Sequence, residues 1–156
     1  MPEKVPMSRS EMMSRIGSRD TAPEIAVRKA LHRAGYRFRL HRKDLPGRPD
    51  LILSKHRAVI FVHGCFWHGH AGCRNFRIPK TNQTFWREKI GRNAERDKEV
   101  TDRLLSLGWK VLVVWECATK RKMVEDTVAE IASWLREHEV AGEIPSVDPS
   151  AEVKDG

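Results

Sequence analysis

The apolar run from Ala58 to His63 constrains the fold of this chain more than any other feature. A strand that is apolar at nearly every position needs cover on both faces, so it belongs in the centre of a sheet. Trp109 to Trp115 forms a second buried strand, and Asp50 to Leu53 forms a shorter one, joined to the first by a turn at residues 54–57. With the helices that alternate with them, these strands predict an α/β domain with a central mixed sheet flanked by helices.

Helices are predicted on either side of these strands. Thr21-Ala22-Pro23-Glu24 has the form of a capping box, and the apolar stripe that follows it ends at Gly35. Residues 84–107 and 124–136 are expected to form the other long helices. A short helix after Ser8 and a half-exposed strand at residues 36–40, where apolar and basic residues alternate, complete the prediction.

The length of 156 residues fits one domain with one core. We expect a flexible N-terminus at residues 1–7, a single folded domain at 8–138 and a flexible tail at 139–156. The net charge of +8 favours a polyanionic partner such as nucleic acid, although a basic soluble protein without such a partner has the same composition. Because no apolar segment of membrane length and no signal peptide is found, we expect a cytoplasmic protein without a membrane partner.

All three cysteines follow the ends of the two buried strands. Cys65, His70 and Cys73 come after the first strand, and Cys117 comes after the second. Three thiolates and one imidazole form a closed tetrahedral set of the kind that holds structural zinc, provided that the two strands are neighbours. The alternative is that Cys65 and Cys117 are ordinary buried cysteines, which are common.

A carboxylate and a histidine are expected to meet on one face of the sheet. If the strands at 50–53 and 58–63 form a hairpin, Asp50 lies opposite Phe61 and His63 is its diagonal neighbour, about 7–8 Å away. Phosphodiester hydrolysis requires stabilised charge at phosphorus and an activated water. A magnesium ion held by Asp50 and a base such as His63 supply them.

The long helix places polar side chains on its apolar face. Asn93 and Asp97 follow Ile90 at spacings that put all three on the same side of the helix. A buried polar group needs a partner, and a histidine is the obvious partner for Asp97. The alternative is a partly exposed helix edge.

Specific motifs now link these residues to a known family. They are Leu45-Pro46-Gly47-Arg48-Pro49-Asp50, Val59-Ile60-Phe61-Val62-His63-Gly64-Cys65-Phe66-Trp67-His68, Phe85-Trp86-Arg87-Glu88-Lys89-Ile90, and Gly108-Trp109-Lys110-Val111-Leu112-Val113-Val114-Trp115-Glu116-Cys117. From about Ser8 to Lys120 the chain resembles the very-short-patch repair (Vsr) family of DNA mismatch endonucleases. One residue is inserted before Cys73 relative to the family pattern, which bears on His70 as a ligand.

The resemblance implies a restriction-endonuclease-like core and assigns roles to individual residues. Asp50 and the Val62 carbonyl would bind Mg²⁺, and Glu24 would lie near them, although its capping role is equally open. His63 would activate water, and His68 would contact phosphate or assist the leaving group, with Asp97 as a histidine partner; a hydrogen-bonded structural histidine is the alternative for His68. DNA contacts are expected from Phe66, Trp67, Trp86, Met13, Arg48 and Asn93; for the aromatic residues and Met13, core packing is the alternative.

The resemblance also implies a reaction and partners. The expected substrate is duplex DNA with a T·G mismatch left by deamination of 5-methylcytosine, nicked on the 5′ side of the mispaired T. The enzyme would act as a monomer, before mismatch-repair proteins and a DNA polymerase, and beside a cytosine-5 DNA methyltransferase. Two alternatives stay open: a restriction-type nuclease for unmismatched sites, and a non-catalytic zinc-dependent DNA-binding module.

Overall fold

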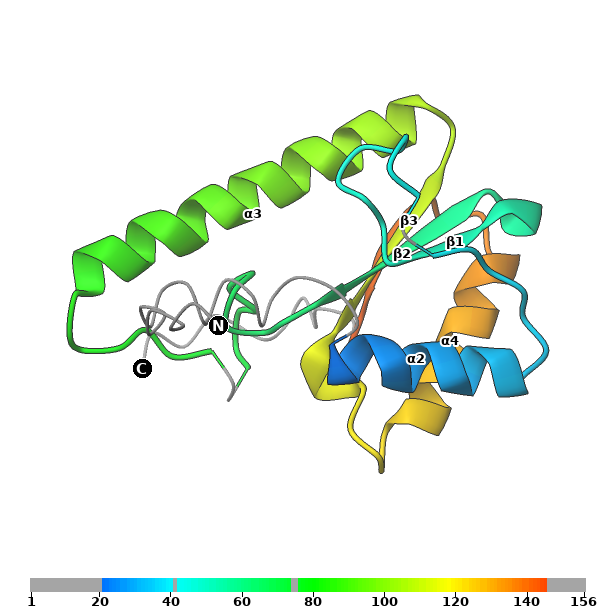
Figure 1. The fold of residues 1–156 in the computed structure, drawn as a ribbon, viewed down its shortest axis with the longest axis horizontal. Coiled ribbons are helices and arrows are strands. Elements are labelled where there is room, and N and C mark those ends of the chain that lie inside the picture. Colours follow the sequence, from blue (N-terminus) through cyan, green and yellow to red (C-terminus); the bar gives the residue numbers. More distant parts are fainter. Residues whose placement is uncertain (1–20, 41, 74–75, 146–156) are drawn as a thin grey trace, which may run out of the picture.

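The computed structural model describes residues 21–40, 42–73 and 76–145, and within them it contains three α-helices and four strands (Figure 1). The short helix predicted after Ser8 lies outside the described residues. The elements follow one another as α2 (Ala22–Arg33), β1 (Leu51–Leu53), β2 (Ala58–His63), α3 (Gln83–Ser106), β3 (Lys110–Trp115), α4 (Val124–Arg136) and β4 (Ala141–Ile144). No helix of this described part is long and apolar enough to span a membrane.

The strands form one mixed sheet in the order β1-β2-β3-β4. β1 runs antiparallel to β2, with Leu51 opposite Ile60, so the predicted hairpin register that sets Asp50 opposite Phe61 is confirmed. β3 runs parallel to β2, and His63 pairs with Trp115 at their ends. The loops that carry the cysteines therefore leave the sheet side by side, as the zinc prediction requires.

The helices divide between the two faces of the sheet. α2 and α4 lie next to each other on one face, and α3 crosses the other (Figure 1). The first face buries a large apolar cluster that includes Leu31, Ile60 and Ile131. The second holds a smaller cluster around Phe61 and Leu104. Because side chains alternate along a strand, His63 and Trp115 lie on the face that α3 covers.

The helix boundaries follow the predicted caps. The Thr21 side chain accepts a hydrogen bond from the Glu24 backbone N–H at 3.4 Å, and α2 is followed by Gly35 with φ +94°. α3 passes next to the turn before Asp50, where Gly47 has φ +72°. A Cβ at Gly47 would lie 2.3 Å from Val100 Cγ1, so only glycine allows this close approach between the turn and α3.

Two sequence predictions need correction. Residues 36–40 do not form a strand; only Arg39 makes an isolated bridge, to Ile52, because β1 offers just three residues for pairing. The tail predicted from residue 139 is ordered at Ala141–Ile144, which pair parallel with β3 as the strand β4. Gly142 makes this pairing possible, because a Cβ there would lie 2.9 Å from Trp134 Nε1.

Candidate active site and metal centre

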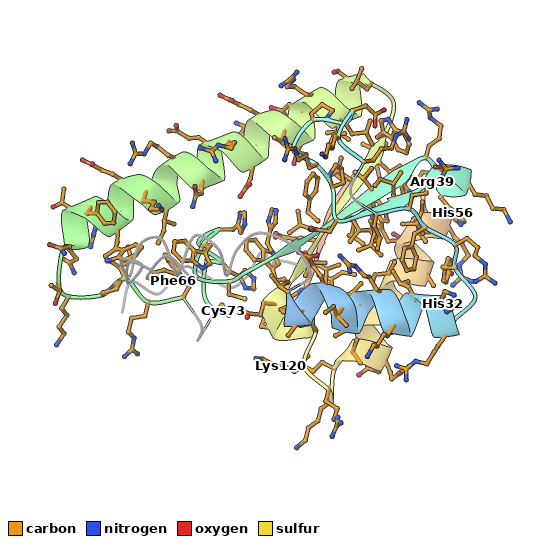
Figure 2. The ribbon with its side chains drawn as sticks, viewed as in Figure 1. His32, Arg39, His56, Phe66, Cys73 and Lys120 are labelled. Atoms are coloured by element: carbon orange, nitrogen blue, oxygen red, sulfur yellow. The ribbon has the colours of Figure 1, made fainter. Side chains whose placement is uncertain are left out.

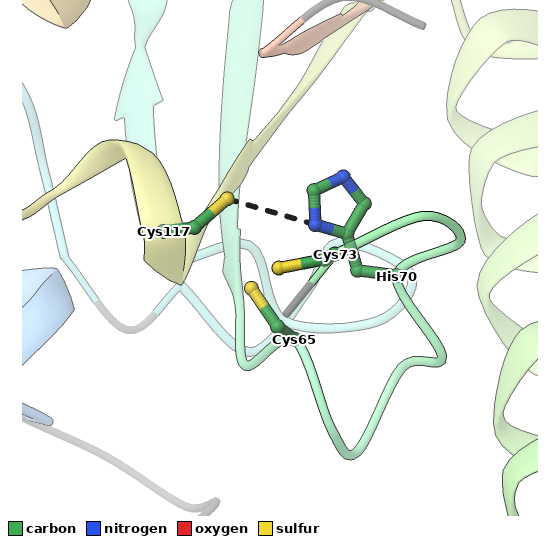
Figure 3. Close-up of side chains that lie close together, drawn as sticks. All are labelled: Cys65, His70, Cys73 and Cys117. Carbon is green, nitrogen blue, oxygen red and sulfur yellow. Dashed lines mark hydrogen bonds between the residues drawn. The ribbon is translucent and has the colours of Figure 1, made fainter. Parts of the chain in front are cut away.

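The three cysteines and His70 come together beside the ends of β2 and β3 (Figure 3). One donor atom from each of Cys65, His70, Cys73 and Cys117 lies within 4.8 Å of all the others, and we call this set the Cys3His cluster. The predicted convergence is therefore confirmed, including His70 despite the inserted residue. The loop from residue 64 onward folds back so that the His70 N–H bonds the Cys65 carbonyl at 2.8 Å.

The geometry of this cluster suits a tetrahedral metal ion. Zn–S bonds of about 2.3 Å and Zn–N bonds of about 2.0–2.1 Å give a sulfur-to-nitrogen edge of about 3.6 Å in a tetrahedron. Cys117 Sγ lies 3.6 Å from His70 Nδ1. The Cys3His cluster can therefore hold a metal, with Nδ1 as the histidine donor.

The charge balance of the cluster points the same way. Burial and the neighbouring Cys65 raise the pKa of the Cys117 thiol to about 12. Burial is also the main cause that raises the pKa of Cys65. Adjacent buried thiols resist ionisation unless a cation neutralises them, and a bound metal ion supplies that cation.

A second candidate site is formed by two acidic side chains, Asp50, which lies just before β1, and Glu24. Burial, and next the negative charge of Glu24, raise the pKa of Asp50 to about 8, although the Val62 N–H donates a hydrogen bond of 2.7 Å to its Oδ2. Glu24 comes from the first turn of α2, is buried, and hydrogen-bonds with Asp50 while it pairs with Arg28 at 2.9 Å. A buried and a partly buried carboxyl group in contact favour a divalent cation between them, and carboxylate oxygens are the donors that Mg²⁺ prefers.

The predicted histidine partner of Asp97 is His68. Its Nδ1 lies 2.5 Å from Asp97 Oδ2, so a side chain of α3 fixes the ring. The His68 ring stacks on His63, with centroids 3.8 Å apart and planes only 4° from parallel. Burial, and next the neighbouring His68, lower the pKa of His63 to about 3.

These three side chains also lie close enough to suggest a metal site. A metal bound to imidazole lies near the plane of the ring, and the planes of His63 and His68 are parallel and stacked. One ion therefore cannot lie in both planes. The arrangement suits proton transfer and phosphate contact better than metal binding.

One cavity of about 350 Å³ is lined both by the Asp50–Glu24 pair and by the two stacked histidines, His63 and His68. Arg48, exposed and with φ +49°, stands on its rim, and Asn93 lines its α3 side. Lys43 and Arg96 also line the cavity, and Arg28 pairs with Glu24, which lines it too. Sequence reasoning gave Arg28 no place in the site. Arg28 was recognisable from its position four residues after Glu24, a spacing that brings opposite charges together on a helix.

Four aromatic residues gather beside the cavity, and we call them the aromatic cluster: Phe66, Trp67, Phe85 and Trp86. Phe66 and Trp67 come from the loop that carries Cys65, His70 and Cys73. The centroids of their rings lie 5.4 and 5.9 Å from that of Trp86 on α3. Figure 2 shows Phe66 beneath the N-terminal part of α3, away from Arg39 and His56 at the other end of the molecule.

The members of this cluster are only partly covered. Phe85, which sequence reasoning did not single out, is 44% exposed. Asn93 donates a hydrogen bond of 2.9 Å to the Trp67 carbonyl, which fixes the loop against α3. Met13, the remaining predicted stacking residue, lies outside the described residues.

Comparison with known proteins assigns the family. The family model described as DNA mismatch endonuclease Vsr matches residues 3–74. The DNA mismatch endonuclease Vsr of Escherichia coli is 45% identical over 131 residues, which are 82% of this chain and 83% of that protein. The chain belongs to the Vsr family of DNA mismatch endonucleases.

Other Vsr-type relatives are nicking enzymes. The type II nicking enzyme V.XorIIP of Xanthomonas oryzae is 52% identical over 112 residues, 72% of this chain and 82% of the relative. The type II nicking enzyme V.NmeAIP of Neisseria meningitidis is 48% identical over 116 residues, with 74% and 82% covered. The resemblance inferred from the sequence motifs is thus confirmed, and the Vsr family places this chain among DNA endonucleases.

Proposed function

We propose that this protein nicks duplex DNA at T·G mismatches, on the 5′ side of the mispaired T, and so starts very short patch repair after deamination of 5-methylcytosine. The observation that carries the proposal is a single cavity that joins the Asp50–Glu24 pair to the histidine pair, with the aromatic cluster at its side. This juxtaposition combines the groups that hydrolyse a phosphodiester with the groups that stack on bases.

The catalytic cation in this proposal is Mg²⁺, held by Asp50 and the Val62 carbonyl with Glu24 nearby. When bound, it would neutralise charge at the phosphate that is cleaved. The donor set supports this assignment, because the raised pKa of Asp50 reports uncompensated negative charge in a buried place. The Val62 N–H holds the carboxylate of Asp50 in one orientation.

His63 is the proposed base. Its lowered pKa keeps the imidazole neutral at neutral pH, so a ring nitrogen can accept a proton from water. A bound phosphodiester would bring negative charge into the cavity and raise the pKa of His63 toward the range of an effective base. The parallel stack with His68 restricts rotation of the His63 ring.

His68 is proposed to contact the phosphate and to assist the leaving oxygen. Asp97 holds its Nδ1, which leaves Nε2 as the atom for this contact. Arg48 and Asn93 line the same cavity, and Arg48 offers a charge to a neighbouring phosphate. Asn93 acts mainly by holding the Trp67 backbone.

The aromatic cluster is proposed to recognise the mismatch by entering the base stack. Opening a stacked step costs a few kcal/mol, and less at a mismatch, so insertion discriminates mispaired from paired DNA. Phe66 and Trp67 suit this role because their loop is fixed at both sides, by the Cys3His cluster and by Asn93. A structural Zn²⁺ in that cluster is part of the proposal.

Other expectations accompany this function. We propose a restriction-endonuclease-like core, which the mixed sheet between helices supports. A monomer in the bacterial cytoplasm, followed by mismatch-repair proteins and a polymerase, is the setting in which such a nick would be processed. The net charge of +8 supports the duplex as partner.

The decisive experiment uses an end-labelled duplex with one T·G mismatch, placed in several methyltransferase site contexts, with and without Mg²⁺. Fully paired duplexes run alongside, together with Asp50→Ala and a matched control, Asp126→Ala, whose exposed carboxylate lies on α4. We expect a Mg²⁺-dependent nick next to the T with the unmodified protein and with Asp126→Ala. Asp50→Ala should lower the rate at least about 10³-fold, because it removes the metal ligand.

The two alternatives give different results in this assay. Equal cleavage of paired and mismatched duplexes would indicate a restriction-type nuclease. Binding without a nick in every context, with metal retained in the Cys3His cluster, would indicate a DNA-binding module.

A further inference from the structure

Trp115 connects the two sites of this protein. It is the last residue of β3, is 8% exposed, and lies opposite His63 in the register of the parallel strands. One face of its indole stacks on His70 of the Cys3His cluster, with centroids 4.2 Å apart and planes 6° from parallel. The His63 ring meets the indole at a steep angle of 72°, with centroids 5.4 Å apart.

The indole is held by a residue from the edge strand. Trp115 Nε1 donates a hydrogen bond of 3.1 Å to Glu143 Oε2 on β4. A hydrogen bond to a carboxylate is stronger than one between neutral groups. It fixes the direction in which the N–H edge of the indole points. The stack on His70 fixes its plane, so the position of the ring is determined from two directions.

These contacts form a continuous series of planar groups. It runs from His70 through Trp115, His63 and His68 to Asp97 on α3. A purely apolar filler such as leucine would bury the same surface but would not fix a plane. A buried tryptophan also needs a partner for its N–H, and here an acidic residue on an otherwise half-exposed strand supplies it.

We propose that Trp115, anchored by Glu143, is a positioning residue that sets the plane of His63 and ties it to metal in the Cys3His cluster. The inference rests on the proposed function in that His63 acts in the nicking reaction. A metal ion on His70 Nδ1 draws electron density from the imidazole, and an electron-poor ring stacks more favourably on the electron-rich face of indole. The negative charge of Glu143 strengthens the same contact by polarising the indole N–H.

The first test measures single-turnover nicking of a T·G duplex, the dissociation constant for that duplex, and metal content per chain. Trp115→Phe keeps a ring but loses the N–H, and Glu143→Leu removes its anchor. We expect each to lower the rate constant about tenfold, while duplex affinity stays within about twofold and metal content is unchanged. Glu143→Gln keeps an acceptor and should restore most of the rate.

The matched control is Trp109→Phe. Trp109 is buried just before β3, where Arg42 and Arg57 lie over its ring, at the opposite end of the strand from His63. It makes the same change of side chain without touching either site, so its nicking rate should equal that of the unmodified protein. A wild-type rate for Trp115→Phe and Glu143→Leu would overturn the proposal, as would a rate loss matched by loss of metal.

The second test does not depend on nicking. The imidazole proton resonances of His63 and His68, assigned with His63→Gln and His68→Gln, are recorded in the metal-loaded protein without DNA. We expect Trp115→Phe, Glu143→Leu and metal removal each to move the His63 signals, while Trp109→Phe leaves them in place. Unmoved His63 signals would overturn the positioning role. If the nicking reaction itself fails in the unmodified protein, only the proposed function falls, and this measurement still decides the positioning.

Discussion

The two faces of the sheet are built by different rules. On the face covered by α2 and α4, almost every buried side chain is apolar, and Leu31, Ile60 and Ile131 are fully buried. On the face covered by α3, the apolar cluster fills only the end near Leu104. Toward the other end of α3, polar groups replace it, and their contacts are hydrogen bonds and ring stacks.

The difference shows where stability and chemistry are separated in this domain. The apolar face supplies the hydrophobic free energy that holds the sheet together. The polar face carries charges that burial disfavours, so we expect it to depend on neighbouring charges and on the proposed metal ions. Changes on the first face should therefore alter folding, and changes on the second should alter chemistry or metal binding.

The largest effect is expected from Cys117, the proposed metal ligand that follows β3. Cys117→Ala removes one of the four donors of the Cys3His cluster. Without a bound metal, the loop at residues 64–73 is no longer connected to the end of β3 through Cys117. We expect nicking to fall at least about 10³-fold, because Phe66, Trp67 and His68 all lie on that loop. Hydrogen exchange should show faster exchange at residues 64–73, with little change at α2 and α4.

Metal content measured on the same sample provides the check on this prediction. Ser106→Ala, which removes a similar small polar group at the exposed end of α3, is the control. Full nicking by Cys117→Ala with no bound metal would show that the loop does not need the cluster. The claim that the face covered by α3 depends on bound metal would then be wrong.

The next effect tests the apolar face. Ile131 is 0% exposed in α4, and Ile131→Ala leaves a cavity against the sheet. We expect a loss of about 3 kcal/mol in the free energy of unfolding, measured by urea titration at a temperature where the variant is folded. The nicking rate per folded molecule should stay the same. A substantial change in that rate would mean that the two faces are coupled more tightly than their separate clusters suggest.

A smaller effect tests the polar face. Asp97→Asn keeps the size of the side chain but removes the charge that pairs with His68. We expect nicking to fall about 10²-fold, the scale of an assisted proton transfer, and the free energy of unfolding to change by less than about 0.5 kcal/mol. Glu95→Gln, an exposed residue of the same helix, is the control and should leave both quantities unchanged. An equal loss of rate in the control would point to a general charge effect on DNA binding.

Sequence reasoning was strongest where one local pattern determines the outcome. The apolar runs of β2 and β3, the cap at Thr21 and the limits of α4 all follow from side chains that lie within a few residues of one another. The hairpin register was assumed from the four-residue turn, and the structure has the assumed register, with Leu51 opposite Ile60. The Cys3His cluster followed once the two strands were taken as neighbours.

Sequence reasoning failed where contacts between residues far apart in the sequence determine whether a segment forms a strand. β4 has a glycine and no clear alternation, and it forms because β3 offers an unpaired edge and Trp134 leaves room at Gly142. The missing strand at residues 36–40 is the reverse case, since its alternating pattern was clear but β1 was too short to pair with it. The hydrogen bond between Trp115 and Glu143 depends on β4, so it could not be predicted from the sequence either.

The smallest expected effect concerns how the polar face tolerates its own charge. Asp50→Asn replaces a carboxyl group whose pKa is raised to about 8 by burial and by Glu24. In an unfolded chain the same group has a pKa of about 3.9, so the folded protein binds more protons between these two values. Its contribution to stability is therefore present at low pH and is lost as pH rises toward about 8. Asparagine resembles the protonated form and avoids that loss.

We therefore expect the stability advantage of Asp50→Asn over the unmodified protein, measured without Mg²⁺, to be larger at pH 8.5 than at pH 5 by at least about 2 kcal/mol. Comparing the two proteins at each pH cancels the protonation of the Cys3His cluster, which both share. Adding Mg²⁺ at pH 8.5 should stabilise the unmodified protein and not the variant, because a ligand that binds only the folded state raises its stability. If the difference between the two proteins is the same at both pH values, neither burial nor the charge of Glu24 raises the pKa of Asp50 in the folded state. The polar face would then tolerate its charge without a cation, and the strongest physical argument for Mg²⁺ at Asp50 would be lost.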